Sequence, residues 1–456
     1  MLKINIALAV ALAGLMAGPA QAADANRFSG VSLPILGFPG GGVTREFVQH
    51  PSFAENLCAM DWNTLRLQVV WSFLDSQEKV DEAILILKDL VTVLDGVRGC
   101  AGQSRFYLIV DFHQFRFGPD CGGHGIPSGK IAPPTATPSD LNCPFLAFEG
   151  FWRNAELRAE WNRFAMQVVA ELPDIADVNR DWLTIAIEPI NEPVAGSEVR
   201  LFDGNPVQQA FKVWYYVASG QSGQIDSRLL PFYREFLQAV ADTVPPHRLA
   251  TFLSQTFFVM DPFLFDHLAF TVPIGRGITI GSDGNYSNAR SLKTLTVRGT
   301  SYSANWLAGP HHYVGAYDPA NPIPTFGSLG KYLLYSATNP FVNRAQMEKR
   351  FQKWDERFRV EAGMHVFVGE YGTYTRLPAY KAWIQDVNEF ATRYTLGGLW
   401  YQYRQDLFTD DQTSYNLLRR FDDDGVPYPL DVQRLKCGEQ FGSMVETIFG
   451  RCVDPF

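Results

Sequence analysis

Two glutamates stand where they could carry out acid–base or nucleophilic chemistry. Glu192 follows a largely apolar run at 185–190, and Glu370 follows a second apolar run at 366–368. Both runs are typical of buried strands, and the proline after Glu192 ends the first one because it supplies no backbone donor. A pair of carboxyl groups is what cleavage of a glycosidic bond needs, one as proton donor and the other as nucleophile or base.

The apolar patterns predict alternating strands and helices along the chain. Strands are expected at 31–38, 64–71, 106–114, 185–190, 250–255, 305–310, 366–370 and 397–403, and helices at 80–97, 155–172, 227–243, 344–360 and 378–394. This alternation indicates βαβ units, and eight strands predict a single (β/α)8 TIM barrel with long βα loops on the catalytic face. A doubly wound dinucleotide-binding sheet is disfavoured, because Arg45 stands where the third glycine of G-x-G-x-x-G belongs.

Polar residues gather where the predicted strands end. In a parallel barrel these ends share one face, and catalytic groups lie there. The candidate residues of this face are Arg66, Asp111, His113, Asn191, Glu192, His311, Tyr313, Glu370 and Trp400. The loops after His113, Glu192 and Tyr313 are long, so we expect them to form a cleft or pocket over the site.

Six short motifs, in this order, resemble glycoside hydrolase family 5. They are Arg66 in LRLQVVW, His113 in VDFHQ, Glu192 in NEP, His311 in GPHHY, Glu370 in VGEYG and Trp400 in GGLWYQY. Three of them, VDFHQ, GPHHY and WYQY, are similar to the endoglycoceramidase-like branch of that family. The resemblance implies a retaining endo-β-glycosidase built on a (β/α)8 barrel, with the acid on strand four and the nucleophile on strand seven.

The two glutamates receive different roles from this resemblance. Glu192 would be the acid, and burial together with the charge of Glu370 is expected to raise its pKa. Glu370 would be the nucleophile, kept ionised by Arg66 and by a hydrogen bond from Tyr313. Once a sugar esterifies Glu370 that charge disappears, so Glu192 can then act as a base towards water.

The other candidates would bind the substrate. Asn191 is expected to hold the sugar 2-hydroxyl, while His113 and His311 position the substrate and hydrogen-bond the carboxylates. Asp111 lies at the same strand end, and Trp400 would be the floor under the sugar at the cleavage point. The candidate substrates are a β-1,4- or β-1,3-glucan, a β-mannan, and the glycan of a glycolipid.

Several alternatives compete with this interpretation. A barrel that binds glycans without cutting them would be expected to lack one glutamate, and both are present, whereas a transglycosylase would use the same residues. The glutamates could instead form a structural ion-pair network, and His113 could be a core residue. Glu188 is expected to hydrogen-bond Arg66 inside the barrel, and His312 to point away from the site as a structural residue.

Neither a metal nor a cofactor is expected. The six cysteines show no C-x₂₋₄-C spacing, and the chain contains neither G-x-S-x-G nor H-E-x-x-H. In an exported chain cysteines usually pair. Proximity in the sequence favours the disulfides Cys58–Cys100, Cys121–Cys143 and Cys437–Cys452.

Residues 1–22 predict a signal peptide. Lys3 supplies the positive start, 6–16 the apolar core, and Ala20-Gln21-Ala22 the small-residue cleavage site. The apolar run is too short to span a bilayer, so the catalytic domain would occupy 23–456 and be secreted or periplasmic, without stable membrane insertion. With a formal net charge of −9, the chain is a poor candidate for nucleic-acid binding. We expect a monomer with a carbohydrate substrate.

Overall fold

The computed structural model describes most of the chain between residues 28 and 401. The described residues are 28–37, 42–60, 62–100, 104–131, 140, 142–179, 181–205, 207–209, 211–213, 215–216, 224–263, 272–273, 279–280, 285–313, 335–339, 342–372 and 379–401. The predicted signal peptide and the predicted Cys437–Cys452 bridge lie outside these residues.

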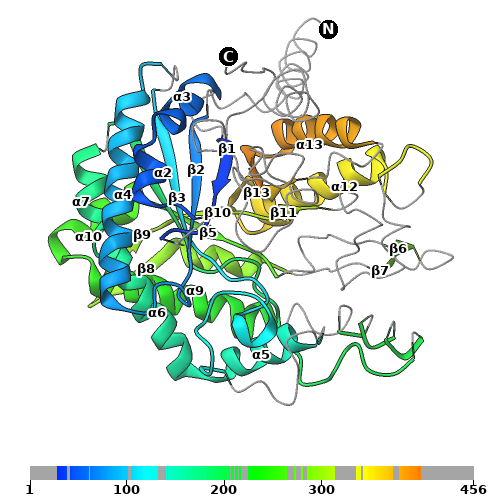
Figure 1. Ribbon diagram of the computed structural model, residues 1–456. Coiled ribbons are helices and arrows are strands. Elements are labelled where there is room, and N and C mark those ends of the chain that lie inside the picture. The colour runs from blue at the N-terminus through cyan, green and yellow to red at the C-terminus, as the bar shows by residue number, and fades with distance from the viewer. Residues whose placement is uncertain are drawn as a thin grey trace, which may run out of the picture.

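A parallel sheet forms the centre of the molecule (Figure 1). Its strands are β1 (Phe28–Leu33), β2 (Thr64–Val69), β3 (Phe106–Phe112), β4 (Leu183–Glu188), β5 (Phe257–Met260), β10 (Asn305–Ala308), β11 (His311–His312), β12 (His365–Val366), β13 (Val368–Tyr371) and β14 (Gly397–Tyr401). They are hydrogen-bonded in the order β11-β13-β14-β1-β2-β3-β4-β5-β10-β12. Two antiparallel pairs lie outside this sheet, β6 (Val272–Pro273) with β7 (Thr279–Ile280) and β8 (Thr294–Val297) with β9 (Thr300–Ser303).

The ten strands amount to eight segments, and the segments close into a barrel. Gly309 and Pro310 separate β10 from β11, and Phe367 alone separates β12 from β13. Since β10 pairs with β12 and β11 pairs with β13, the same two segments meet at both ends of the strand order. Two further backbone bonds, from Phe367 N to Ala308 O and from Gly369 N to Pro310 O, continue the ladder across the breaks. The predicted (β/α)8 architecture is therefore confirmed.

Glycine allows the two broken segments to approach closely. A Cβ atom at Gly369 would lie 2.7 Å from the carbonyl oxygen of Gly309, a distance that real Cβ atoms do not adopt. This close approach puts His311 of β11 opposite Glu370 of β13 in the ladder. Local backbone packing thus brings two candidate residues together.

Helices cover the outside of the barrel, as Figure 1 shows for α4, α6 and α9. The helices are α2 (Arg45–Gln49), α3 (Pro51–Met60), α4 (Gln77–Val97), α5 (Cys143–Arg153), α6 (Ala155–Val169), α7 (Leu172–Asn179), α9 (Leu230–Thr243), α10 (Pro246–Gln255), α12 (Arg344–Trp354) and α13 (Tyr380–Tyr394), with short helical turns η2 (Pro119–Cys121), η3 (Ile225–Leu229), η4 (Ser287–Lys293) and η6 (Asp355–Glu361). The Ser76 side chain caps α4 by accepting from Lys79 N, which satisfies an otherwise unpaired donor. All five helices expected from the sequence are present, and the sequence did not predict α2, α3, α5, α7 and α10.

The prediction for the fifth strand was wrong. Residues 250–255 belong to α10, and the strand is β5, which starts at Phe257. Pro246 begins this helix, where a missing N–H costs nothing. Leu249, Phe252 and Leu253 then lie on one buried face at helical spacing.

Two apolar clusters show which way the strand side chains point. The smaller cluster fills the barrel and contains Phe28, Tyr107, Ile109, Ala186, Val259, Leu307, Phe367 and Leu399. The larger one lies between the strands and the helices. Because side chains alternate along a strand, each inward residue is followed by an outward one.

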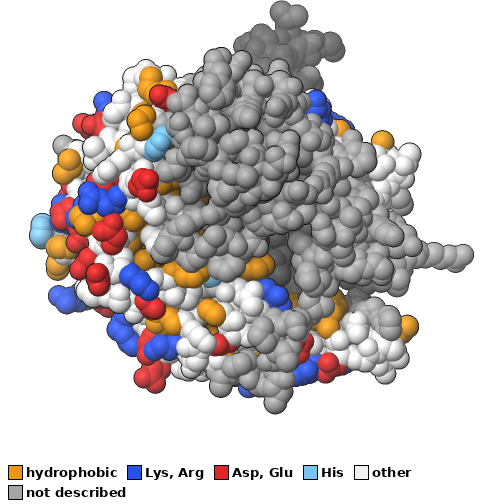
Figure 2. Space-filling view, viewed as in Figure 1, with side chains coloured by type: hydrophobic (Ala, Val, Ile, Leu, Met, Phe, Trp, Pro, Cys, Tyr) orange, Lys and Arg blue, Asp and Glu red, His pale blue; other side chains and the backbone are white. Residues whose placement is uncertain are grey.

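Two of the three predicted disulfides are present. Cys58–Cys100 joins α3 to the end of α4, and Cys121–Cys143 joins η2 to the start of α5. Among the described helices, none is both long and apolar enough to cross a membrane. The described part of the face in Figure 2 carries acidic and basic side chains interspersed.

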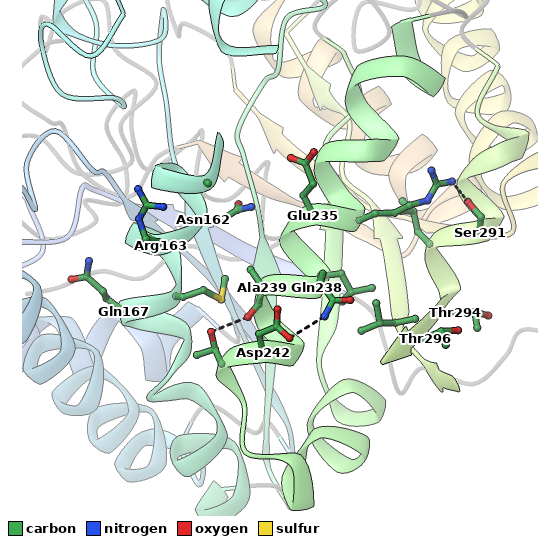
Figure 3. Close-up of a pocket in the computed structure, with 17 residues that line it drawn as sticks. Asn162, Arg163, Gln167, Glu235, Gln238, Ala239, Asp242, Ser291, Thr294 and Thr296 are labelled. Carbon is green, nitrogen blue, oxygen red and sulfur yellow. Dashed lines mark hydrogen bonds between the residues drawn. The ribbon is translucent and has the colours of Figure 1, made fainter. Parts of the chain in front are cut away.

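A groove with a volume of about 980 Å³ lies outside the barrel, between α6, α9 and β8 (Figure 3). Asn162 and Met166 of α6, Leu237 of α9 and Leu295 of β8 help to line it. At one edge of the groove the Arg234 guanidinium donates to the Ser291 hydroxyl, and Figure 3 marks this bond at Ser291 with a dashed line. None of the candidate residues from the strand ends contributes to this groove.

Candidate active site

Arg66 of β2 is the centre of the polar cluster inside the barrel. It is fully buried, and its guanidinium donates to both oxygens of Glu188, from Nε at 2.7 Å and from Nη2 at 2.8 Å. Nη2 also lies 3.0 Å from Asp111 Oδ2 and 2.8 Å from Asn191 Oδ1, while Nη1 bonds Glu370 Oε1. The bond to Glu188 confirms the sequence prediction for that residue. We call the side chains of Arg66, Asp111, Glu188 and Glu370 the Arg66 cluster.

One guanidinium in this cluster faces three carboxyl groups. Burial opposes the charged form of Arg66, but the surrounding carboxylates outweigh it and raise its pKa well above the usual value. Burial raises the pKa of Asp111 to about 7 and that of Glu188 to about 7, with Arg66 opposing the shift in both. A single positive charge does not balance three buried negative ones, so the cluster retains protons near neutral pH.

Glu370 is held by two different donors. Its side chain is 5% exposed, Arg66 Nη1 bonds Oε1, and the Tyr313 hydroxyl donates to Oε2 at 2.8 Å. These are the two contacts that the sequence predicted. Their effect on the charge of Glu370 stays a prediction.

Glu192 lies across from Glu370 and is more accessible, with 23% of its side chain exposed. Its Oε1 is 2.9 Å from Nδ1 of His311, and the same nitrogen is 3.4 Å from Glu370 Oε2. One oxygen of each glutamate and one ring nitrogen of His311 all lie within 4.8 Å of one another. Burial lowers the pKa of His311 to about 3, so a neutral ring stands between the two carboxyl groups.

His113 is fixed from two sides. Its Nδ1 is 2.7 Å from Asp111 Oδ2, and its ring stacks on His124, with ring centroids 5.2 Å apart. Burial lowers the pKa of His113 to about 3 and that of His124 well below its usual value. His124 comes from the loop that the Cys121–Cys143 bridge closes, so this loop supports the site from behind.

Asn191 and Gln114 join the ends of β3 and β4. The Asn191 amide donates to the carbonyl of Gln114 at 2.9 Å, and the Gln114 amide donates to the carbonyls of Asn191 and Glu192 at 2.6 and 3.1 Å. Gln114 was not among the predicted site residues. Its position directly after His113 in the sequence was the feature that could have indicated a place in the site.

The structure does not place Trp400 in the site. Leu399 belongs to the inner cluster, so Trp400 points outwards, is fully buried and packs edge-on against Tyr371 at 5.5 Å. The residue that faces the site is Tyr401, whose ring lies 6.4 Å from that of Tyr313. The predicted role of Trp400 as a sugar platform is therefore incorrect for this arrangement. His312 also points outwards, as expected, and stacks on Trp383 at 5.4 Å.

Asp261 is a further buried residue at this face, and the sequence patterns did not indicate it. It follows β5 directly, its Oδ2 accepts from Glu192 N at 2.5 Å, and the Tyr233 hydroxyl donates to its carbonyl oxygen at 2.8 Å. Burial and then Glu188 raise the pKa of Asp261 well above the usual value. The sequence prediction placed the fifth strand too early. Asp261, which directly follows the actual strand β5, was therefore not recognised as a residue at a strand end.

Within the part of the chain that the structure describes, two sets of side chains have the spacing of metal ligands, Glu192–His311–Glu370 and Glu188–Asp261–His311. Both oxygens of Glu188 already accept from Arg66. The oxygen of Asp261 nearest the site accepts a backbone N–H. With a fixed guanidinium in contact, the donor set is arranged for hydrogen bonding rather than for a cation.

Comparison with known proteins supports the fold. No protein-family model and no curated sequence matches the chain. Among solved structures, it is similar to an endogalactoceramidase, with a TM-score of 0.54 and 14% identity over 93% of this chain and 80% of that one. It is also similar to a family 5 xyloglucanase from Paenibacillus pabuli, with a TM-score of 0.50 and 12% identity over 94% of this chain and 99% of that one. These similarities show the fold alone, and that fold agrees with the one expected from the family 5 resemblance of the motifs.

Proposed function

We propose that this protein is a retaining endo-β-glycosidase. The observation that carries the proposal is the pairing of Glu192 and Glu370, whose nearest oxygens lie within 4.8 Å of each other at the carboxyl end of the barrel. Retaining enzymes hold their carboxyl groups about 5–5.5 Å apart, and inverting ones roughly 6.5–9.5 Å apart to admit a water. Oxygens this close leave less room for a water between the two carboxyl groups than the inverting arrangement needs, which supports the retaining reaction.

In the first step Glu370 attacks the anomeric carbon. Arg66 and Tyr313 hold its two oxygens and so orient the attacking lone pair. Glu192 gives its proton to the glycosidic oxygen, the bond to the leaving group breaks, and a glycosyl ester of Glu370 forms. Glu192 suits this task because it is accessible and contacts a neutral histidine.

In the second step water displaces the Glu370 carboxylate from the sugar. Esterification removes the negative charge of Glu370, which lowers the proton affinity of Glu192. Glu192 then takes a proton from water, the water oxygen attacks the same carbon, and Glu370 leaves as a carboxylate. Two inversions restore the β configuration.

The similar structures and the sequence motifs support a proposal for the substrate class. The proteins to which the chain is similar are named for galactoceramide and xyloglucan. We infer a glycolipid glycan or a β-linked polysaccharide as the substrate. The predicted signal peptide at 1–22 and the disulfides at Cys58–Cys100 and Cys121–Cys143 support export.

The test is hydrolysis of a panel containing β-1,4-glucan, β-1,3-glucan, β-mannan, xyloglucan and a glycosylceramide. Proton NMR during the reaction should show the β anomer first, before mutarotation. Appearance of the α anomer first would replace double displacement by inversion. Absence of cleavage across the panel would reject the hydrolase assignment.

A transglycosylase is the second candidate, because it would use the same two glutamates. Adding a second sugar as acceptor to the same assays separates the two. A hydrolase releases reducing ends in proportion to substrate consumed. A transglycosylase would instead convert most of the substrate into longer or mixed glycosides.

A further inference from the structure

The backbone of Glu192 adopts an unusual conformation. Its φ is +40°, in the left-handed region that residues other than glycine rarely occupy. The residue that follows is Pro193, which disfavours helical conformations in the residue before it. Such a conformation persists only where neighbouring groups hold it.

Two side chains hydrogen-bond to the backbone of Glu192, one at its N–H and the other at its carbonyl oxygen. Asp261 Oδ2 accepts from Glu192 N at 2.5 Å, and Gln114 Nε2 donates to Glu192 O at 3.1 Å. Asp261 follows β5 and Gln114 follows β3, the strands on either side of β4. The direction in which Glu192 leaves the barrel is therefore set by both neighbouring strands.

Asp261 is also connected to the side-chain carboxyl group of Glu192, through the ring of His311. Its Oδ2 lies 3.7 Å from Nε2 of His311, and Nδ1 of His311 lies 2.9 Å from Glu192 Oε1. The bond from the Tyr233 hydroxyl fixes the backbone of Asp261 itself. A single fully buried carboxyl group thus contacts the backbone of Glu192 and the ring that touches its side chain.

We propose that Asp261 is a positioning residue for the acid–base group: it holds Glu192 in its left-handed conformation and orients His311 against the Glu192 carboxyl group. This inference rests on the proposed glycosidase function. The acceptor geometry of Asp261 matters here more than its charge, because a protonated carboxyl group keeps one oxygen that can accept the Glu192 N–H. The raised pKa of Asp261 agrees with this.

Two substitutions separate geometry from charge. Asp261→Asn removes the charge and keeps an acceptor oxygen at the same place. Asp261→Glu keeps the charge and moves the oxygens by one methylene. If Asp261 positions Glu192, the asparagine variant should be the more active of the two.

The measurement is kcat/KM on the full chain with two aryl β-glycosides of one sugar, a 2,4-dinitrophenyl and a phenyl glycoside. The phenyl leaving group needs a proton from Glu192 and the dinitrophenyl group does not. Asp261→Glu should lose about 100-fold on the phenyl glycoside, the lower end of what general acid catalysis contributes, and less than about 10-fold on the other. Asp261→Asn should lose less than about 10-fold on both.

A matched control is Asp386→Asn. Asp386 is a buried carboxyl group on α13 that bonds Tyr335 and Arg344, away from the barrel interior. Its substitution should leave the ratio of the two kcat/KM values unchanged. Melting temperatures establish that each variant is folded, and if Asp261→Glu does not fold, Asp261→Ala, which lacks the acceptor, takes its place with the same expected selectivity.

Two results would overturn the inference. Equal loss on both glycosides in Asp261→Glu, or in Asp261→Ala where that variant replaces it, would mean that Asp261 supports the fold and not the acid. A larger loss for asparagine than for glutamate would mean that its charge matters and not its position. By contrast, a wild-type protein that cleaves neither these glycosides nor the polysaccharide panel would reject the proposed function itself.

Discussion

Glu370 and Glu192 face each other but are held in place in different ways. Glu370 is nearly buried, and its side-chain oxygens receive bonds from Arg66 and Tyr313. Glu192 is more than four times as exposed in relative terms, at 23% against 5%, and the contacts from Asp261 and Gln114 reach its backbone. Arg66 and Tyr313 hold Glu370 through its carboxylate. Asp261 and Gln114 hold Glu192 through its backbone, and its carboxyl group contacts the neutral ring of His311.

The difference suits two tasks. A nucleophile must stay ionised and aimed, so a guanidinium bonded to its carboxylate is useful. An acid–base group must gain and lose a proton in each cycle, and a cation bonded to its carboxylate would hold it in the ionised form. Anchoring Glu192 through the backbone leaves its proton free to exchange.

The largest effect is expected from Glu370→Ala. Without a nucleophile no glycosyl ester forms, so turnover should fall by several orders of magnitude on every β-glycoside, including activated ones. Steady-state assays with the dinitrophenyl glycoside measure this. Appreciable turnover of that substrate would show that Glu370 is not the nucleophile.

Glu192→Ala should affect the two steps unequally. Loss of general acid catalysis should reduce the rate on unactivated substrates roughly 10²–10⁴-fold. With the dinitrophenyl glycoside the ester should form quickly and then persist, giving a burst followed by slow turnover.

Added azide tests the assignment of roles. It should restore the slow step in Glu192→Ala and give the β-glycosyl azide, because a small anion can attack the ester without base help. Rescue of Glu370→Ala with formation of the α-azide would exchange the roles of the two glutamates.

Tyr313→Phe should produce a smaller loss that does not depend on the leaving group. It removes one hydrogen bond to a charged group, worth about 1.5–3 kcal/mol, so kcat should fall roughly 10–100-fold. The loss should be the same for phenyl and dinitrophenyl glycosides, in contrast to Asp261→Glu. Tyr394→Phe, on the outer helix α13, is the control. A loss restricted to the phenyl glycoside would place Tyr313 with the acid.

The smallest effect concerns stability and pH. Burial raises the pKa of the Glu188 carboxyl group from its usual 4.5 to about 7, so the folded protein binds more protons than the unfolded chain between these values. Raising the pH through this window should therefore destabilise the fold. Because the charge of Asp111 accounts for part of the raised pKa of Glu188, we expect Glu188→Gln to remove only about 1–2 kcal/mol of this decline.

Chemical denaturation between pH 4.5 and 7.5 measures this decline. Glu149→Gln serves as the comparison, since Glu149 is a buried acid bonded to Arg228 outside the Arg66 cluster. If wild type and Glu188→Gln lose stability at the same rate as the pH rises, the cluster does not hold a proton at Glu188.

The sequence predicted the barrel because polar residues stand directly after apolar runs. Arg66, His113 and Glu370 could be placed on one face from that pattern alone, since parallel strands end on the same side. Asp261 escaped it, because β5 has only four residues and the preceding helix α10 contains a competing apolar pattern. Short apolar runs do not distinguish strand from helix.

The error at Trp400 has a different cause. Both faces of a barrel strand are buried, so hydrophobicity does not reveal which of two neighbouring residues points inwards. Only the position of Leu399 in the inner cluster decides that Tyr401, and not Trp400, reaches the site. The hydrogen bond between Asp261 and the Glu192 backbone could not be predicted from the sequence either, because it depends on the positive φ of Glu192.

The Cys121–Cys143 bridge makes one part of this molecule sensitive to its redox surroundings. It closes the loop that carries His124 against His113, and neither cysteine lies in a barrel strand. In a reducing compartment the eight segments would keep their pairing, while the support behind His113 would loosen. We therefore expect the reduced chain to retain its barrel and lose activity, a separation that equal loss of both on reduction would contradict.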